Sequence, residues 1–561
     1  MRLIWNGIVA SAVAAALVLP GAGQARSLSG AYLAGIQAEQ QLDYEEAARY
    51  FVRALSYDVD NPALLDAAIR AQVARGEVST AIVLAQRLEE TDTNPLGLIL
   101  QLAGNVRDGQ LTPALETLSN PQAQESLPLL ADIWRGWLLI NTGEEEDGFE
   151  ALRDLALHPE WGLFGQNHLA LAHVALGDYD AAAQVFADLD PVTTTLHRFG
   201  TRVRIEAQAK AGETRAALDL VDTLLEGSIG DVELETLRAA LTDGNPVQRS
   251  MAGPMDGFAI ALFDIGSQLN TGRRSEALLY LRVAHFLKPD LHEAALLIGQ
   301  ILEQQDQFDL ARQVFETVPL DAPQSAEARL GLAAVYQSAE RDDEAIATLS
   351  ALAQSYPEAL RVRYFQAEAL RVAERYEDAL PIYDQSVDLA VAQDRAFWQL
   401  YYGRAVSKHL TDDWPGAEAD FRRALELRPD QPMVLNYLGY SLVEKGLKLD
   451  EALGMIQSAV EQRPDSGYII DSLGWVYFQL GRYDEAVDPM EQAVALEPID
   501  PVINDHLGDV YWMVGREREA EFQWRRALSF DPEPEERARI LRKLDIGLDA
   551  VRAEEGHSVA N

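Results

Sequence analysis

Acidic and aromatic side chains recur at helical spacing near the C-terminal end of the sequence. In three successive segments they stand at positions i, i+4 and i+7: Asn436, Tyr440 and Val443; Asp471, Trp475 and Phe478; Asp505, Asp509 and Trp512. This spacing places the side chains of each segment on one face of a helix. Aromatic rings beside carboxylates suit a peptide with apolar and basic side chains, so we predict a partner-binding groove. The alternative is that these rings belong to a core between helices.

Residue patterns typical of catalysis are missing from the sequence. It contains no GxxxxGK[ST] or GxGxxG phosphate-binding loop and no GxSxG nucleophile motif. There is no cysteine, and His168 and His173 are five residues apart rather than the four that align two ligands on a helix. His506, next to Asp505, is interpreted as a packing or solvated residue. We therefore expect a non-enzymatic protein without a metal or cofactor.

The segments that carry the groove residues are copies of one unit. Residues 471–498 and 505–532 are 34 positions apart and share 11 of 28 residues. Six earlier markers precede Gly474 at steps of 34 to 36 residues: Ile265, Gly299, Ala333, Ala367, Gly403 and Gly439. In each unit an alanine and, four residues later, a bulky residue follow the marker, as Ala486 and Met490 follow Gly474. Eight consecutive units are thus predicted to be amphipathic helical hairpins with small residues where the helices cross.

The 34-residue helix–turn–helix period is that of the tetratricopeptide repeat (TPR). Six weaker units precede the eight, centred on Gly35/Ala47, Ile69/Ala81, Leu102/Ala114, Gly136/Gly148, Ala170/Ala182 and Ile205/Ala217. The predicted fold is an all-α TPR solenoid, a right-handed superhelix of about 14 repeats in two arrays. The arrays span 26–227 and 258–532. A connecting helix and Gly/Pro-rich linker fill 228–257, which is too short for a catalytic domain. A capping helix covers 533–555, and 556–561 form a tail.

Charge and the N-terminal segment predict where the protein acts. The formal net charge of −42 disfavours binding to nucleic acid or to anionic lipid surfaces. "MRLIWNGIVASAVAAALVLPGAGQARS" is typical of a secretory signal, with cleavage after Ala25; the competing interpretation is an uncleaved anchor. No other segment approaches the length of a membrane span. Since no cysteine can carry a lipid, we expect a periplasmic or cell-envelope protein that is not a lipoprotein.

Three motifs between 433 and 532 resemble a particular group of envelope proteins: "LNYLGYSL", "DSLGWVYFQLGRYDEA" and "DHLGDVYWMVGR". They are similar to the C-terminal repeats of TPR adaptors for carboxy-terminal processing proteases. The resemblance implies binding to such a protease and to its peptidoglycan-hydrolase substrates. Adaptors of this kind are outer-membrane lipoproteins, and this sequence lacks the lipid-acceptor cysteine. The alternative is a TPR subunit of an envelope assembly or polysaccharide-export complex.

Overall fold

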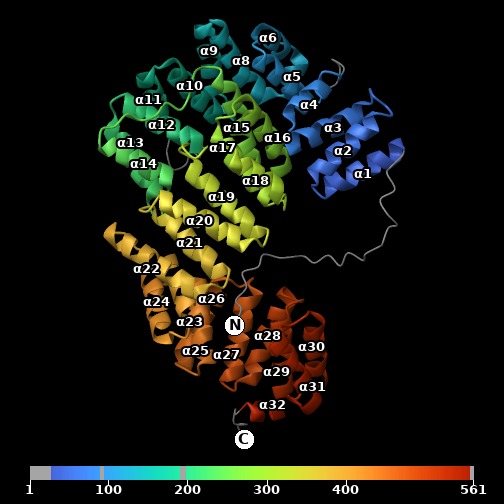
Figure 1. Cartoon of the computed structure of the whole chain (residues 1–561), viewed down its shortest axis with the longest axis vertical. Coiled ribbons are helices and arrows are strands. Elements are labelled where there is room, and N and C mark those ends of the chain that lie inside the picture. Colours follow the sequence, from blue (N-terminus) through green and yellow to red (C-terminus); the bar gives the residue numbers. More distant parts are fainter. Residues whose placement is uncertain (1–26, 89–93, 190–197, 556–561) are drawn as a thin grey trace. The chain divides into compact units, whose positions relative to one another are not determined.

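The computed structural model of the 561-residue chain describes residues 27–88, 94–189 and 198–555 (Figure 1). Over these ranges every regular element is a helix, and none of the helices is both long and apolar enough to cross a bilayer. The predicted signal peptide, 1–25, and the predicted tail, 556–561, lie outside the described residues. The chain forms two compact units, one ending at Ser355 and the other beginning at Tyr356.

The first unit contains twenty helices in the described ranges. They are α1 (Leu28–Gln40), α2 (Tyr44–Leu55), α3 (Pro62–Arg75), α4 (Val78–Ala85), α5 (Pro95–Arg107), α6 (Leu111–Leu118), α7 (Pro121–Ser126), α8 (Pro128–Thr142), α9 (Glu145–Ala156), α10 (Gly162–Leu176), α11 (Tyr179–Ala187), α12 (Arg198–Lys210), α13 (Thr214–Leu225), α14 (Val232–Thr242), α15 (Asp256–Leu269), α16 (Arg274–Leu287), α17 (His292–Glu303), α18 (Phe308–Glu316), α19 (Ser325–Ser338) and α20 (Asp342–Ser355).

The second unit carries the predicted groove residues. Its helices are α21 (Leu360–Val372), α22 (Tyr376–Ala392), α23 (Trp398–Leu410), α24 (Trp414–Leu427), α25 (Pro432–Glu444), α26 (Leu449–Gln462), α27 (Gly467–Gln479), α28 (Tyr483–Leu496), α29 (Pro501–Met513), α30 (Glu517–Ser529), α31 (Pro534–Ile546) and α32 (Leu548–Glu554).

Each predicted unit is a pair of antiparallel helices. The six N-terminal units are α1/α2, α3/α4, α5/α6, α8/α9, α10/α11 and α12/α13, and the eight C-terminal units run from α15/α16 to α29/α30. The short helix α7 and the connecting helix α14 stand outside these pairs. The predicted all-α solenoid of stacked helical hairpins is therefore confirmed, and Figure 1 shows the hairpins following one another in each unit.

Small residues let the paired helices cross closely, as the sequence pattern predicts. A β-carbon built on Gly474 would lie 2.6 Å from Met490 Cγ, and one on Gly508 would lie 2.5 Å from the Trp524 ring. Met490 and Trp524 are themselves fully buried. A larger side chain at either glycine would push the two helices apart, so the glycine and the bulky residue are complementary halves of one contact.

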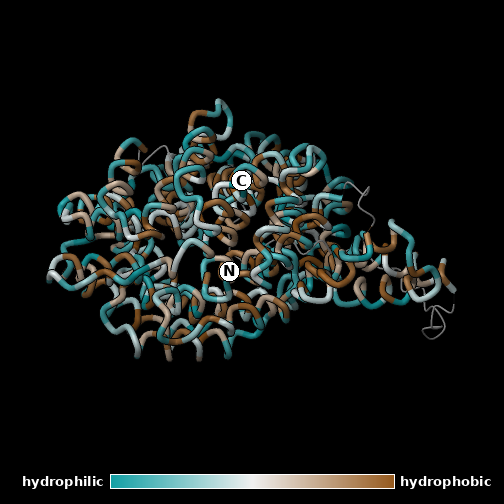
Figure 2. The backbone as a smooth tube through the Cα atoms, turned by 90° about the horizontal axis from the view of Figure 1, so that it is seen from above, coloured by the Kyte–Doolittle hydropathy of each residue, from teal (hydrophilic) through white to brown (hydrophobic). Residues whose placement is uncertain are grey.

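Local signals set the ends of these helices. Before α29, the Asp500 carboxylate accepts a hydrogen bond from the Ile503 amide at 2.9 Å, and Pro501 occupies the first helical position, where no amide donor is needed. In the turn from α27 to α28, Gly481 adopts a φ of 75°, the left-handed conformation that glycine takes without strain. Hydrophobic and hydrophilic residues alternate along the helices (Figure 2), so the core is distributed along each unit.

The segment 228–257 is packed into the first unit. It contains α14, and the chain that follows is held by hydrogen bonds: the Ser250 amide donates to Glu206 at 2.7 Å, and Ser250 Oγ accepts from Arg202 at 3.0 Å. At its end, a β-carbon on Gly257 would lie 2.1 Å from the Trp137 ring. One hydrophobic cluster extends from Tyr44 to Val335. The compact units divide at 355/356, and the predicted division into two repeat arrays at 228–257 stays a prediction.

The segment 533–555, predicted as one capping helix, forms two. Gly547, with a φ of 81° and a ψ of 156°, leaves helical geometry between α31 and α32. Ile540 of α31 and Leu548 of α32 are both buried in the cluster that contains the last hairpins. The bend at Gly547 thus separates two helices that both bury residues in this cluster.

Candidate functional site

The eight predicted groove residues lie on the first helices of the last three hairpins. Asn436 and Tyr440 are on α25, three more are on α27, and Asp505, Asp509 and Trp512 are on α29. The 34-residue period repeats the same helical positions, so the structure brings the residues of α27 and α29 together on adjoining helices. We call the set of eight the acidic–aromatic face. Five of its side chains are buried and three, Tyr440, Trp475 and Trp512, are half-buried.

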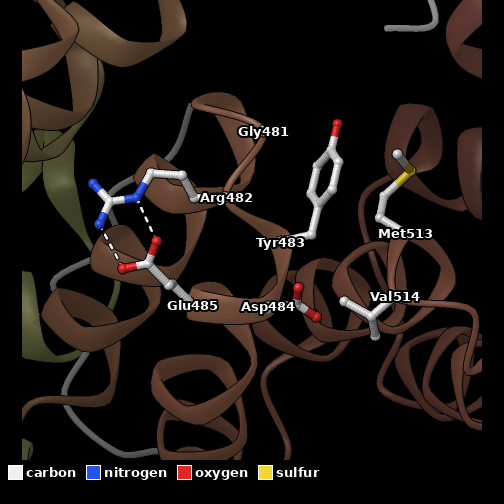
Figure 3. Close-up of a pocket in the computed structure, with 7 residues that line it drawn as sticks. All are labelled: Gly481, Arg482, Tyr483, Asp484, Glu485, Met513 and Val514. Atoms are coloured by element: carbon white, nitrogen blue, oxygen red, sulfur yellow. Dashed lines mark hydrogen bonds and ion pairs between the residues drawn. The ribbon is translucent and has the colours of Figure 1, made fainter. Parts of the chain in front are cut away.

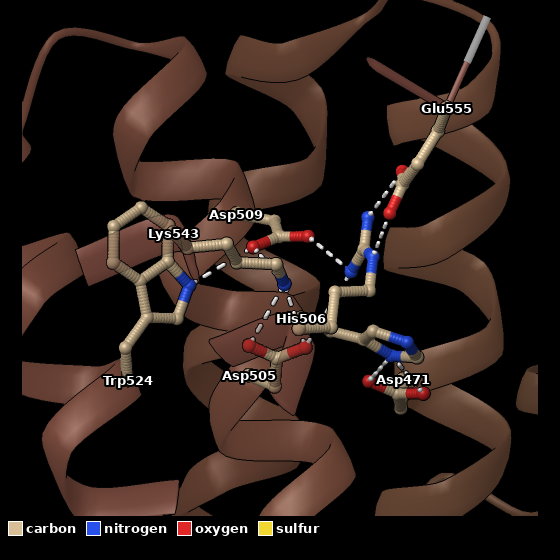
Figure 4. Close-up of polar contacts among 8 residues, drawn as sticks. Asp471, Asp505, His506, Asp509, Trp524, Lys543 and Glu555 are labelled. Atoms are coloured by element: carbon tan, nitrogen blue, oxygen red, sulfur yellow. Dashed lines mark hydrogen bonds and ion pairs between the residues drawn. The ribbon is translucent and has the colours of Figure 1, made fainter. Parts of the chain in front are cut away.

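Asp471 faces the next repeat. Both of its carboxylate oxygens lie 3.0 Å from His506 Nδ1 on α29 (Figure 4). Burial alone would lower the pKa of His506, but the charge and hydrogen bond of Asp471 raise it above its ordinary value. The Trp475 ring stacks on His506 with centroids 4.0 Å apart and on Phe478 at 4.7 Å. This part of the face is therefore a contact between repeats.

Asp505 and Asp509 share a buried cation from α31. Lys543 Nζ lies 2.7 and 2.8 Å from the Asp505 oxygens and 2.6 Å from Asp509 Oδ1, and its side chain has no exposed surface (Figure 4). The Trp524 indole also donates to Asp509 Oδ1, at 2.9 Å. Burial raises the pKa of Asp505, and Lys543 counteracts that rise. The two buried carboxylates are therefore ion-paired with a lysine of α31, a helix outside the hairpins.

A second cation from α31 lies beside the same carboxylates. Arg539 Nη1 is 3.5 Å from Asp509 Oδ2, and Arg539 Nε is 2.8 Å from a carboxylate oxygen of Glu555. The guanidinium thus joins the face to the residue that follows α32. Neither Arg539 nor Lys543 was predicted as part of the site. The available signal was Lys543 itself, a cation three residues after Ile540 and so on the apolar side of its helix.

Helix α32 lies against Trp512 and Phe478. The Trp512 indole donates to Asp549 Oδ2 at 3.1 Å, and a β-carbon on Gly547 would lie 2.7 Å from the Trp512 ring. The guanidinium carbon of Arg552 is 5.0 Å from the centroid of the Phe478 ring, within the range of a cation–π contact. Two aromatic members of the face, from two repeats, therefore contact one short helix of the same chain.

The α25 members of the face lie in a similarly enclosed environment. Asn436 is 6% exposed, and burial raises the pKa of Tyr440 well above its usual range, with further contributions from the carboxylates of Glu444 and Asp471. The geometry of the whole face matches the alternative in which these residues pack between repeats. Its role in binding a partner stays a prediction.

Two further features of the described ranges bear on a possible site. Those ranges hold no group of three or more His, Asp or Glu residues placed to bind a metal ion. A pocket of about 180 Å³ lies at the turn between α27 and α28 and is lined by Gly481, Arg482, Tyr483, Asp484, Glu485, Met513 and Val514 (Figure 3). Within it Arg482 is ion-paired to Glu485, with Nε 2.7 Å from Oε1. The pocket is thus lined by the turn between α27 and α28 and by the end of α29.

Comparison with protein families agrees with the hairpin geometry. A tetratricopeptide-repeat profile matches residues 296–359, 330–396 and 411–467, and a second one matches 468–496. The chain contains tetratricopeptide repeats. The matched region extends from α17 to the end of α28 and includes the α25 and α27 parts of the acidic–aromatic face. TPR arrays in general present extended surfaces on which other proteins can bind.

Two curated relatives match part of the chain. The TPR repeat-containing protein PA4667 of Pseudomonas aeruginosa is 29% identical over 187 residues, which are 33% of this chain and 31% of that protein. Human tetratricopeptide repeat protein 13 is 26% identical over 187 residues, 32% of this chain and 21% of that one. The chain therefore spans less than a third of the length of either relative.

Solved structures of helical repeat proteins are similar over different lengths. The Cut9–Hcn1 hetero-tetramer of the APC/C has a TM-score of 0.40 and 16% identity, over 93% of this chain and 97% of that one. YrrB, described as a TPR protein with an unusual peptide-binding site, has a TM-score of 0.28 and 19% identity, over 35% of this chain and 98% of YrrB.

Proposed function

We propose that this protein is a non-enzymatic scaffold of the bacterial cell envelope that docks other proteins on its last TPRs. One observation supports docking there: helix α32, which belongs to no hairpin, is held on the acidic–aromatic face by apolar and polar contacts. Leu548 and Val551 of α32 are buried, and Asp549 accepts a hydrogen bond from Trp512. A face that holds one short helix from its own chain has the shape and chemistry to hold a helix from a partner.

The proposal also includes a location in the cell envelope and a class of partner proteins. We infer export from the N-terminal segment, whose short apolar run ends in Gly23-Gln24-Ala25. The motifs between 433 and 532 support a role in which the scaffold holds a carboxy-terminal processing protease together with its peptidoglycan-hydrolase substrates. Tyr440, Trp475 and Trp512 supply aromatic surface for such contacts, and the acidic surroundings favour a partner with basic side chains.

Affinity purification from the native envelope tests the proposal. We expect the tagged chain, beginning at Arg26, to co-purify with a carboxy-terminal processing protease and a cell-wall hydrolase. The purified protease should cleave that hydrolase faster when the scaffold is added, and the scaffold alone should cleave nothing. An intact Met1 in a cytoplasmic fraction would overturn the envelope assignment. Capture of assembly or export-complex subunits in place of the protease would overturn the adaptor role.

A pair of aromatic variants locates the docking surface. Trp512→Ala removes a half-buried ring from the face, whereas Phe522→Ala removes a ring that is 62% exposed on α30 of the same hairpin. We expect Trp512→Ala to reduce partner capture by about thirtyfold, the effect of losing a central aromatic contact, and Phe522→Ala to leave it unchanged. Hydrogen exchange measured on both variants shows whether α21–α28 remain folded. Full capture by a folded Trp512→Ala protein would rule out the face as the docking surface.

A further inference from the structure

Helix α32 is linked to the cap of the solenoid and also contacts the acidic–aromatic face. The cap of the solenoid is α31, whose Lys543 and Ile540 are fully buried against the last hairpin. Helix α32 comes after it, beyond the bend at Gly547, and continues no hairpin. It contacts Trp512 of α29 and Phe478 of α27, and so spans two repeats as a docked segment would.

The contacts between α32 and the acidic–aromatic face are few and come from one side of the helix. Leu548 and Val551, three positions apart, are 0% and 3% exposed, and Asp549 and Arg552 add the contacts to Trp512 and Phe478. The remaining residues up to Glu554 are exposed or half-buried. A seven-residue helix is not stable on its own in water, so α32 depends on the face for its structure. Besides the chain link at Gly547, ion pairs of Arg542 with Glu554 and of Arg539 with Glu555 hold α32 and its C-terminal end to α31.

The fit between α32 and the face is incomplete. Nη1 of Arg552 is buried but has no hydrogen-bond partner among the described residues. A buried donor without an acceptor loses its hydration and gains nothing in return. A segment that placed its arginine over Phe478 and also supplied an acceptor for this nitrogen would bind better than α32 does. A segment from another protein could therefore bind the face more tightly than α32 does.

We propose that α32 is a resident ligand of the acidic–aromatic face, and that a partner binds by replacing it with a short helix of the same chemistry. The replacing segment carries two apolar residues three positions apart followed directly by an arginine, as Leu548, Val551 and Arg552 do. This inference rests on the proposed docking function and adds the class of segment that is recognised. Two things favour an arginine-bearing segment of another protein: the net charge of −42 on this chain, which attracts cations, and the Phe478 ring, which the Arg552 guanidinium of the resident helix contacts.

A peptide-binding experiment with the full-length chain tests the replacement. The probe is a fluorescent peptide with the sequence of residues 546–556, and the variant is Leu548→Asp, which puts a charge where α32 is most buried and so releases it. We expect the variant to bind the peptide at least tenfold more tightly than the wild-type chain. In the wild type the tethered α32 competes at an effective concentration of the order of millimolar. Equal affinities, or no binding to the variant, would overturn the proposal.

Two controls identify the contacts involved. A peptide with alanine at the position of Arg552 should bind the Leu548→Asp chain about fivefold more weakly, because it lacks the cation–π contact with Phe478. Adding Phe478→Leu to the chain should remove that difference between the two peptides. An unchanged difference would show that the peptide binds elsewhere. Hydrogen exchange on α25–α30 of the Leu548→Asp chain reports whether the face itself stays folded.

A second measurement leaves the contacts of α32 intact. Because the sequence has no cysteine, Ala553→Cys provides a unique thiol on an exposed position one helical turn after Asp549. A bimane attached there should be quenched by Trp512 while α32 is docked, and excess unlabelled peptide should relieve the quenching. Relief should be absent in the matched Trp512→Phe chain. Fluorescence that does not change at saturating peptide would overturn the proposal.

The identity of the occupant can be separated from the proposed function. Reversible dimerisation of the wild-type chain that is lost in the Leu548→Asp chain would make α32 of a second copy the occupant, contrary to the proposal. Both peptide assays use only the purified chain. If both peptide assays fail while envelope partners are captured, α32 is not a resident ligand but the scaffold function stands. If the peptide assays succeed while no envelope partner is captured, α32 is a resident ligand but the proposed scaffold function is wrong.

Discussion

Replacing Lys543 by methionine should loosen the C-terminal end of the second unit far more than its position near the chain end suggests. The Lys543 ammonium lies 2.6–2.8 Å from oxygens of both Asp505 and Asp509, and neither Lys543 nor Asp509 exposes any side-chain surface. Removing the cation leaves two carboxylates buried side by side. Breaking a buried ion pair by deleting one partner typically costs about 3–5 kcal/mol. The equilibrium constant for local opening should rise by roughly two to three and a half powers of ten, since about 1.4 kcal/mol corresponds to a factor of ten.

Hydrogen exchange with mass spectrometry measures this opening helix by helix. We expect Lys543→Met to lose most of the protection of α29, α31 and α32. Protection in the first unit should remain unchanged, because repeat arrays are stabilised mainly through neighbouring units. The matched control is Arg542→Met, one residue earlier on the same helix, where the pairing with Glu554 is exposed and contributes little.

A compensated variant separates loss of charge from loss of packing. Combining Lys543→Met with Asp505→Asn and Asp509→Asn removes all three charges and keeps an oxygen that can accept from the Trp524 indole. Because an uncharged replacement of a buried ion pair is often neutral or stabilising, this protein should regain most of the protection. Unchanged exchange in Lys543→Met, or a triple variant as open as the single one, would refute the electrostatic explanation.

Three further outcomes are expected. Gly474→Leu should destabilise the last hairpins by about 1–3 kcal/mol through overpacking, seen by urea unfolding, while Gly454→Leu on α26, which faces open space, should not. Burial would lower the pKa of His506, but its carboxylate partner on α27 raises it above 6.5. Protonated His506 thus stabilises the last hairpins fully below about pH 6.5, and that contribution is lost as the pH rises through the raised pKa. His506→Gln should abolish this pH dependence of stability, and an unaltered dependence of stability on pH would contradict the explanation. Gly257→Ala should lower the free energy of unfolding by about 1–3 kcal/mol and increase hydrogen exchange in both α8 and α15. Gly253→Ala, which has no neighbour within 4 Å, should change neither quantity.

The repeat architecture could be predicted because its determinants lie close together in the sequence. Gly474 and Met490 are 16 residues apart and form one contact within one hairpin. The same contact recurs in the next unit, so each repeat is an independent observation of the same physical requirement. Periodicity and the alternation of small and bulky residues were sufficient to place every helix pair.

The segment 228–257 shows where composition is a poor guide. Its glycines and prolines predict irregular chain after the connecting helix, but they do not indicate whether that chain is packed. Gly257 is small because the Trp137 ring occupies the space beside it, and Trp137 is 120 residues away in the sequence. Such a contact depends on how the hairpins stack, which no local pattern encodes.

For the candidate site, the sequence by itself determined which residues share a face, and the tertiary structure decided what covers that face. The spacing of Asp471, Trp475 and Phe478 places them on one side of α27 whatever surrounds that helix. The elements that satisfy these side chains come from other repeats and from the chain end: His506 for Asp471, Lys543 for Asp505 and Asp549 for Trp512. These partners lie 35 to 38 residues away and meet only after the helices stack. A helical period in the sequence shows that one face of a helix makes contacts. It carries no information about which distant segment of the chain makes those contacts.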